Sequence, residues 1–290
     1  MSVRVEALDT AIEGFRQKNG KMYRVDIETK LGKATFRGKV IFDSGREKTG
    51  VLKIYSSKDG GNWDFAACKQ MSTLNFLHAK KLSSGWVMDV DEYVSQGYWG
   101  IMVLREEIKG KTIRQREEPV QLSEARKLSG KLFEQLGAVS NDKALIEMGM
   151  GYCGDISPGN VVEGDKGYSI IEWDGQLGQV GMPDITAGYV APEVVSDVEG
   201  ETVSQVLADT YSLGCVLARV LMGKTEWRKI APVGDFSSSA TFEKVAPNLL
   251  PDTHDFFRKV LAMDPLDRMA EGADSPGKHY RGLGKMFGVR

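Results

Sequence analysis

The chain has 290 residues, enough for one large domain or two lobes with a core that needs no disulfide bonds. It carries 38 Lys and Arg against 40 Asp and Glu, a formal net charge of -2, which gives no sign of a surface for nucleic acid or an anionic membrane. The cysteines, Cys68, Cys153 and Cys215, are odd in number and far apart, so they indicate neither a disulfide framework nor a zinc site. We therefore expect a reducing compartment.

The N-terminal residues 1–22 lack the apolar core of a signal peptide, and no stretch approaches about 18 apolar residues. This pattern is typical of a cytoplasmic protein, although a secreted effector would share it. Within this extension Val5, Leu8, Ile12 and Phe15 have helical spacing, which predicts a short amphipathic helix over 5–15.

Residues 23–108 are expected to form a small β-rich lobe. Short runs at 23–31, 34–42 and 49–55, separated by glycine and polar turn residues, predict an antiparallel meander. Further along we expect a helix near 63–78 and strands at 86–94 and 98–106, before a polar linker.

Residues 109–270 are expected to form a larger helical lobe. Two sets of apolar residues share helix faces: Leu122, Ala125, Leu132, Leu136 and Val139 in one helix, and Leu213, Val216, Leu217, Val220 and Leu221 in another. Between them VVEGDKGYSII predicts a β-hairpin. Residues 271–290 are rich in glycine and lack periodicity, so we expect a loose tail. The fold class is therefore α+β.

The segment GDISPGNVV places Asp155 and Asn160 five residues apart on a loop that enters the hairpin. Phosphoryl transfer needs a carboxylate to orient the attacking hydroxyl and an oxygen ligand for magnesium, and this spacing supplies both. Alone, the hexapeptide is equally consistent with a simple turn.

Three further segments follow in order: TAGYVAPE at 186–193, ADTYSLGCVLARVLMG at 208–223 and LAMDPLDRM at 261–269. With the preceding loop they resemble the eukaryotic-type protein kinase family over about residues 31–269, with Asp209, Ser212 and Gly214 in pattern positions. The resemblance implies a two-lobed protein-kinase-like fold that uses ATP and Mg²⁺ or Mn²⁺. It also implies that Arg268 pairs with Glu193.

In the small lobe LGKATFRGKV resembles the glycine-rich loop that covers ATP phosphates, although Ala34 replaces one glycine and an ordinary turn would explain the segment equally well. Lys53 in VLKIY resembles the strand lysine that contacts the α and β phosphates. The hinge would lie around 104–108. The nucleotide-binding residues implied are Gly32, Gly38, Val40, Val51 and Lys53.

Several positions depart from the family pattern. Gln70, with Leu74 four residues later, stands where a glutamate holds the lysine, and Asp64 is a more distant substitute. Cys153 and Gly154 replace the histidine and arginine before the catalytic aspartate, so we expect no switch by activation-loop phosphorylation. Ser157 stands where a phosphate-contacting lysine is usual, which reduces the positive charge at the transferring group.

The metal motif departs most, because SIIEWDG replaces Asp-Phe-Gly. Glu172 matches by strand position and Asp174 is the alternative ligand; on an extended strand both would share one side. With Asn160 they are the metal candidates. Thr186 and Tyr189 favour a Ser or Thr acceptor by resemblance. The histidines, His78, His254 and His279, have no metal or triad spacing and are expected to be structural or exposed.

The leading hypothesis is an ATP-dependent protein Ser/Thr kinase with Asp155, Lys53 and Asn160 as catalytic residues and a protein substrate as partner. A pseudokinase that acts as a nucleotide-binding or scaffolding regulator is the alternative. A small-molecule kinase of the aminoglycoside type is the third, because GDISPGN followed by an acid-Trp-Asp strand also resembles that group. The oligomeric state is not predicted.

Overall fold

The computed structural model describes residues 23–31, 35–42, 45–56, 63–83, 87–95, 98–165, 167–175, 188–195, 205–230 and 251–289. The helix expected over 5–15 lies outside the described residues, as do Gly32, Ala34 and Thr186. The chain divides into two compact units. Unit 1 comprises Met1–His78 and Gly85–Ile108, and unit 2 comprises Ala79–Ser84 and Lys109–Arg290.

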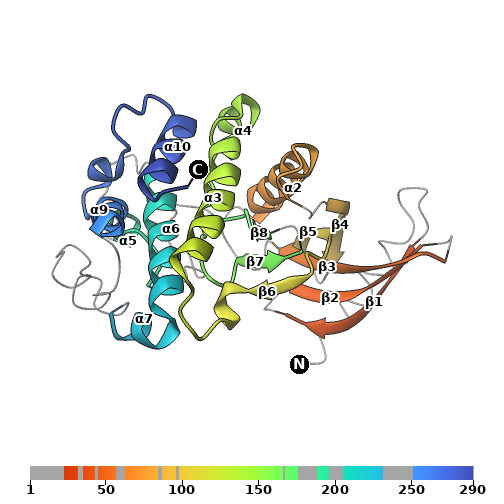
Figure 1. The fold of residues 1–290 in the computed structure, drawn as a ribbon. Helices are drawn as coiled ribbons and strands as arrows, with labels where there is room; N and C mark the ends of the chain where they lie inside the picture. The colour runs from red at the N-terminus through yellow and green to blue at the C-terminus, as the bar shows by residue number, and fades with distance from the viewer. Residues whose placement is uncertain are drawn as a thin grey trace. The chain divides into compact units, whose positions relative to one another are not determined.

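Unit 1 contains a five-stranded antiparallel sheet in the order β1-β2-β3-β5-β4, together with the helix α2 (Figure 1). The predicted meander and the predicted helix are confirmed. The elements are β1 (Tyr23–Lys30), β2 (Thr35–Phe42), β3 (Glu47–Ser56), α2 (Trp63–Ala79), β4 (Val87–Ser95) and β5 (Tyr98–Glu106).

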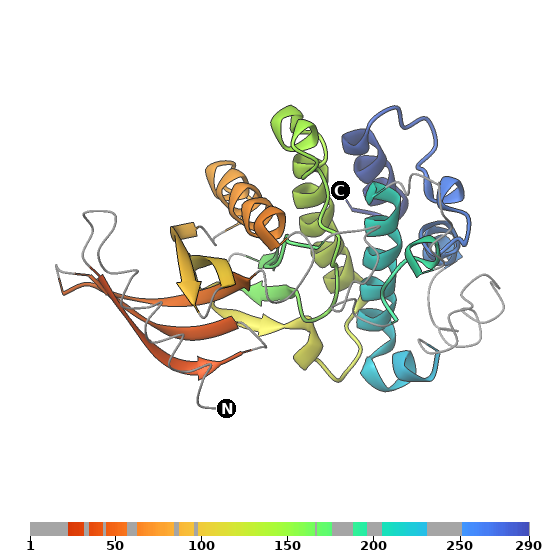
Figure 2. The same ribbon diagram turned by 180° about the vertical axis from the view of Figure 1, so that it is seen from behind.

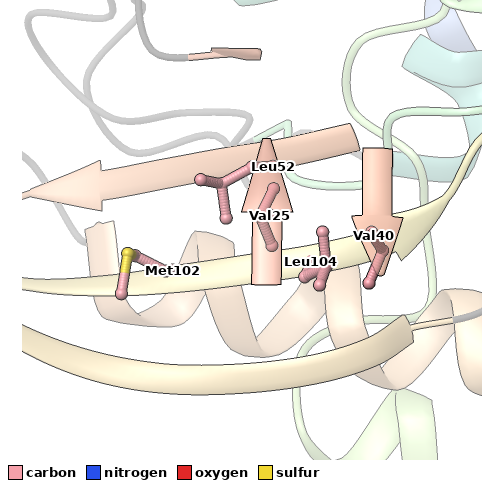
Figure 3. Close-up of a cluster of buried hydrophobic side chains, with 5 residues drawn as sticks. All are labelled: Val25, Val40, Leu52, Met102 and Leu104. Carbon is pink, nitrogen blue, oxygen red and sulfur yellow. The ribbon is translucent and has the colours of Figure 1, made fainter. Parts of the chain in front are cut away.

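One face of this sheet carries a buried apolar cluster. Alternate residues of a strand point to opposite faces, so Leu52 and Ile54 of β3 lie on this face while Lys53 lies on the other. Every core member of the cluster is less than a tenth exposed, and Figure 3 shows their side chains: Val25, Val40, Leu52, Met102 and Leu104.

Gly38 lies in β2 where this strand approaches β1 most closely. A Cβ atom at Gly38 would lie 2.4 Å from the backbone oxygen of Asp26, and the β1–β2 register shifts between Ile27 and Thr29 beside this contact. No side chain fits in that space, so the strand pairing itself requires glycine here.

Unit 2 combines a three-stranded antiparallel sheet, in the order β6-β7-β8, with helices (Figure 2). The hairpin predicted over 161–171 is confirmed. The elements are β6 (Gly110–Thr112), η2 (Ile113–Gln115), α3 (Leu122–Val139), α4 (Lys143–Glu147), β7 (Val161–Gly164), β8 (Gly167–Ile170), α5 (Pro192–Val195), α6 (Gln205–Met222), α7 (Lys224–Ile230), α9 (Pro251–Val260), η4 (Pro265–Arg268) and α10 (Pro276–Met286).

The two predicted helix faces are found in α3 and α6. Leu132, Leu136 and Val139 of α3 are fully buried, and so are Val216 and Leu217 of α6. Within the described part of the chain, no helix has both the length and the apolar character that crossing a membrane requires.

The prediction of a loose tail over 271–290 is wrong. Ser275 caps α10 by accepting a hydrogen bond from Lys278 N, and the helix packs beside α3 (Figures 1 and 2). Its fully buried Leu283 and the following Phe287, whose ring lies 4.4 Å from that of Phe256, join the core. The glycines misled the prediction, because Gly284 belongs to the packed helix and lies against the Phe133 ring, 3.5 Å from the point that its Cβ would occupy.

His279 of α10 is fully buried and makes two hydrogen bonds. Its Nδ1 accepts from Ala270 N at 3.0 Å, and its Nε2 lies 2.8 Å from Thr210 Oγ1. Since Thr210 Oγ1 donates to Val206 O, it accepts from Nε2, and the ring is therefore neutral with its proton on Nε2. Burial lowers the pKa of His279 to about 4.

This burial predicts a pH-dependent stability. The pKa of the imidazole returns to about 6.5 in the unfolded chain, so between pH 6.5 and 4 the unfolded state binds more protons than the folded state. The contribution of His279 is complete above pH 6.5 and is lost as the pH falls towards 4, by on the order of 3 kcal/mol. Urea unfolding at pH 7.5 and 5.0 should show about 2 kcal/mol less pH dependence in His279→Gln than in the unsubstituted protein.

The exposed His78 provides the matched control, because His78→Gln should keep the full pH dependence. Equal pH dependence of the unsubstituted protein and His279→Gln would contradict the assignment of a buried neutral ring.

Candidate functional site

The loop before β7 brings together the two polar residues that the sequence singled out. Asn160 Nδ2 donates hydrogen bonds to Asp155 Oδ2 at 2.7 Å and to Asp155 O at 3.0 Å. Both side chains are partly buried, and Asn160 N donates to Ser157 O at 3.0 Å, which closes the turn. The amide of Asn160 therefore orients the Asp155 carboxylate, as a site built on this pair requires.

A buried carboxylate on α6 fixes the start of this loop. Asp209 is 1% exposed and accepts hydrogen bonds from Cys153 N at 2.6 Å and from Gly154 N at 2.8 Å. Hydrogen bonds to an ionised group are about twice as strong as neutral ones. Asp209 thus connects the loop that carries Asp155 to the helix at the centre of unit 2.

The segment 171–175, which contains both acidic metal candidates, is held against the same loop. Ile171 N donates to Asn160 O at 2.9 Å, and Cys153 Sγ donates to Glu172 O at 3.3 Å. Gly154 and Gly175 are in backbone contact: a Cβ on Gly154 would lie 2.6 Å from Gly175 O. The two segments therefore form one backbone-linked structure.

The expectation that Glu172 and Asp174 share one side, which depends on an extended strand, stays a prediction. β8 ends at Ile170, and residues 171–175 are not in a strand. Trp173, between the two acids, is fully buried, and its Nε1 donates to Ile170 O at 3.1 Å. Glu172 and Asp174 are therefore separate candidates on either side of a buried indole.

The donor atoms present suit a hard cation. Asp155, Asn160, Glu172 and Asp174 offer carboxylate and amide oxygens, the ligand type that Mg²⁺ prefers. Among the described residues, no group of three or more His, Cys, Asp or Glu side chains is arranged to hold a metal ion. Magnesium is commonly held by one or two carboxylates together with substrate phosphates and water.

The pairing of Arg268 with Glu193 is confirmed. The guanidinium is fully buried and donates to the two carboxylate oxygens of Glu193 at 2.6 and 2.9 Å. It also donates to backbone oxygens of Leu207, Ala262 and Met263. The Tyr211 ring lies 4.8 Å away, so the buried charge is surrounded by compensating groups.

In unit 1 Lys53 lies on β3, with Val51 and Tyr55 on the same face. Its Nζ is 5.5 Å from the centroid of the Tyr55 ring, and its side chain is partly buried. Val51 is 2% exposed. The structure thus brings two of the predicted nucleotide-binding residues to one face of the sheet.

Val40 and Val51, both implied as nucleotide-binding residues, lie on opposite faces of the sheet. Val40 of β2 is paired with Lys48 of β3, and the register is continuous from there to Lys53. Lys48 and Val51 are three residues apart, so Val40 and Val51 point to opposite faces. Val40 is fully buried in the apolar cluster with Leu52 and is a core residue.

Gln70 lies on α2 and is 1% exposed, next to a residue that the sequence did not single out, the fully buried Lys69. A buried ammonium is unusual, because transfer of a charge from water is costly unless it is compensated. Sequence offers little signal for it, since a lysine on a helix is normally solvated. Asp64 is exposed and accepts a hydrogen bond from Phe65 N in the first turn of α2, which gives it a local role at the helix terminus.

The sequence also missed two arginines near the loop. Arg219 of α6 is 3% exposed and donates to the backbone oxygens of Ile113, Arg114 and Arg116, which fixes η2. Arg114 N in turn donates to Pro158 O at 2.7 Å. Arg219 is a charged residue within a largely apolar helix. This break in the apolar pattern is the signal that could have identified it.

An antiparallel five-stranded sheet with the helix α2, followed by a helical unit with an Asp155–Asn160 loop, a β-hairpin and a buried Glu193–Arg268 pair, defines a protein-kinase-like fold. A comparison with solved structures agrees. A MAP kinase from Leishmania major, LmaMPK10, matches with a TM-score of 0.58 and 16% identity, over 98% of this chain and 87% of that one. No family model and no curated protein matches the sequence.

The buried ion pair predicts a large loss of stability on truncation. Arg268→Ala should lower the free energy of unfolding by about 3–5 kcal/mol, because it leaves the Glu193 carboxylate and several backbone oxygens without their partner. Arg258→Ala is the control: Arg258 is half exposed and pairs with Asp255 at 2.7 Å, so its loss should cost at most about 1 kcal/mol. Chemical denaturation measures both, and similar losses would contradict this account.

The contact between Gly154 and Gly175 predicts that neither loop tolerates a side chain there. Gly154 has φ +86°, a conformation that favours glycine, so Gly154→Ala adds a backbone clash to conformational strain and should cost about 3 kcal/mol or more. Gly272 has φ +67°, and no atom lies within 4 Å of the point that its Cβ would occupy, so Gly272→Ala should cost only about 1 kcal/mol. If urea unfolding gives equal losses of unfolding free energy for the two variants, the clash at Gly154 is relieved with little loss of stability.

Proposed function

We propose that this protein is an ATP-dependent protein serine/threonine kinase. The observation that carries the proposal is the Asp155–Asn160 pair, joined at 2.7 Å on a loop that Asp209 fixes to α6. This arrangement presents one oriented carboxylate and one amide oxygen, the two groups that phosphoryl transfer requires from such a loop.

In this proposal the acceptor hydroxyl binds to the Asp155 carboxylate, which orients its oxygen and accepts its proton. The oxygen then forms a bond to the γ-phosphorus of ATP while the bond to the β–γ bridging oxygen breaks, and ADP leaves. The hydrogen bond from Asn160 keeps Asp155 in position for this step. Residues of the loop therefore bind and position the acceptor and receive its proton.

Nucleotide and metal binding are assigned to the remaining predicted residues. Lys53 would bind phosphate oxygens, Val51 would contact the adenine, and Gly32 and Gly38 belong to the segment that would cover the phosphates. Asn160, with Glu172 or Asp174, would hold Mg²⁺ or Mn²⁺, which neutralises phosphate charge when bound.

The close packing at Gly154 is in line with the expectation that phosphorylation of the activation loop does not regulate this protein. An arginine at this position would place its Cβ within 2.6 Å of Gly175 O, so the backbone contact excludes it. Without that arginine a phosphorylated residue in the segment between Gly175 and Tyr189 would lack the usual cationic partner. The proposed acceptor remains Ser or Thr, in line with Thr186 and Tyr189.

Transfer of radiolabelled phosphate from ATP, with Mg²⁺ or Mn²⁺, to generic protein substrates tests the proposal. Label should appear on Ser or Thr, and Asp155→Ala should lower the rate by about a hundredfold or more because the acceptor hydroxyl loses its base. Asp255→Ala, an exposed aspartate on α9, should leave the rate unchanged. Undiminished transfer by Asp155→Ala would remove Asp155 from the mechanism.

A pseudokinase is the second candidate, and two buried uncharged residues favour it, because Gln70 is an amide where a glutamate is usual and Ser157 leaves the loop without a cation. Calorimetric titration with ATP and Mg²⁺ distinguishes the two functions. Binding without transfer under either metal, by protein that is demonstrably folded, would support the pseudokinase. Separate Glu172→Ala and Asp174→Ala variants would then identify which acid affects metal-dependent binding.

A further inference from the structure

Arg114 lies beside the loop that carries Asp155, and this loop contains no lysine or arginine of its own. From Cys153 to Asn160 the only charged residue is Asp155, and Ser157 is 2% exposed. Arg114 of η2 lies next to this loop: its Cδ is 3.9 Å from the point where a Cβ on Gly159 would lie, and Ser157 Oγ is 3.7 Å from the same point. The Arg114 guanidinium is therefore the nearby positive group that an incoming ligand can meet.

The backbone of Arg114 is fixed by several independent contacts. Arg114 N donates to Pro158 O at 2.7 Å. The buried Arg219 donates hydrogen bonds to the backbone oxygens of Ile113, Arg114 and Arg116. Thr112 and Gln115 form a capping box at the start of η2, with Thr112 N donating to Gln115 Oε1 at 3.0 Å. A preorganised backbone lowers the entropic cost of using the side chain for recognition.

Two neighbouring basic residues already have partners, whereas the Arg114 side chain has none among the described residues. Arg116 forms ion pairs with Glu124 and Glu163, and Lys224 forms one with Glu117. The Arg114 side chain is exposed and makes no ion pair or hydrogen bond with any residue in the described part of the chain. Its charge is therefore available to bind an anion.

Arg114 also lies close to the segment that ends at Glu193. Burial raises the pKa of Tyr189, and the charges of Arg219 and Arg114 act in the opposite direction. The Tyr189 ring packs on Trp227, with ring centroids 5.6 Å apart. Arg228 adds a further exposed charge near Arg219. The loop that carries Asp155 and the Tyr189 segment thus both lie near Arg114.

We propose that Arg114 is a specificity-determining residue that selects acceptor polypeptides with an acidic or phosphorylated residue close to the Ser or Thr that is modified. The inference rests on the proposed function and names its substrate class. A guanidinium offers paired N–H donors that match the oxygens of a carboxylate or a phosphate, so the two anions share one recognition chemistry.

Two variants test the proposal from opposite directions. Arg114→Glu reverses the charge. Gly159→Glu adds a carboxylate beside an intact Arg114, and the structure leaves room for its Cβ, with nothing closer than 3.7 Å. Arg281→Glu is the matched control, because Arg281 is an exposed arginine on α10 with no partner among the described residues.

The first measurement is binding, by fluorescence anisotropy, of peptides in which Ala replaces the acceptor Ser. Four peptides with Glu, phosphoserine, Ala or Lys two or three positions from the acceptor separate carboxylate from phosphate recognition. The acidic peptides should bind about threefold to tenfold more tightly than the Ala peptide at low ionic strength, and less so at high salt. Both Arg114→Glu and Gly159→Glu should abolish this preference, and Arg281→Glu should retain it.

Because binding does not require phosphate transfer, this result separates the inference from the proposed function. If the protein binds acidic peptides preferentially but transfers no phosphate, the inference about Arg114 is supported and the proposed kinase activity is contradicted. Transfer with equal binding of Glu and Lys peptides, or a preference that survives in Arg114→Glu, would overturn the inference. An Arg114→Glu protein whose KM for ATP rises while the peptide preference persists would instead assign Arg114 to the nucleotide, and would likewise overturn it.

Discussion

The Asp209 carboxylate, buried in α6, accepts hydrogen bonds from two successive backbone amides, Cys153 N and Gly154 N. Those bonds set the conformation of the loop on which Asp155 and Asn160 meet. The bend at Gly154 then brings the loop into backbone contact with Gly175, in the segment of the acidic metal candidates. One charged group on a rigid helix therefore positions both halves of the candidate site in unit 2.

The C-terminal part of the chain holds the first turns of this helix. Arg268 donates to Leu207 O, Tyr280 donates to Val206 O, and His279 contacts Thr210. Their partners Val206, Leu207 and Thr210 flank Asp209 in the sequence of α6. The helix α10 is thus part of the support for the site, and its loss would be felt at Asp155 through α6.

The departures from the protein kinase pattern have physical causes that differ in kind. Gly154 cannot be an arginine because its Cβ would meet Gly175 O. Trp173 is fully buried between Glu172 and Asp174, and its Nε1 donates to Ile170 O at the end of β8. Ser157 removes a cation from the loop, and Arg114 places one beside it. The site keeps the oriented acid and amide while its charge distribution is altered.

The sequence by itself determined the elements and the order of the motifs, because strand alternation, helical periodicity and the Asp155–Asn160 spacing are local properties of the chain. It also identified Glu193 and Arg268 as a pair through their family resemblance. Only the tertiary structure decided that Val40 is a core residue, since this depends on the pairing of β2 with β3. The same holds for α10, whose glycines suggest flexibility in isolation but allow close packing against α3. Such features depend on contacts between residues distant in sequence, which no local pattern encodes.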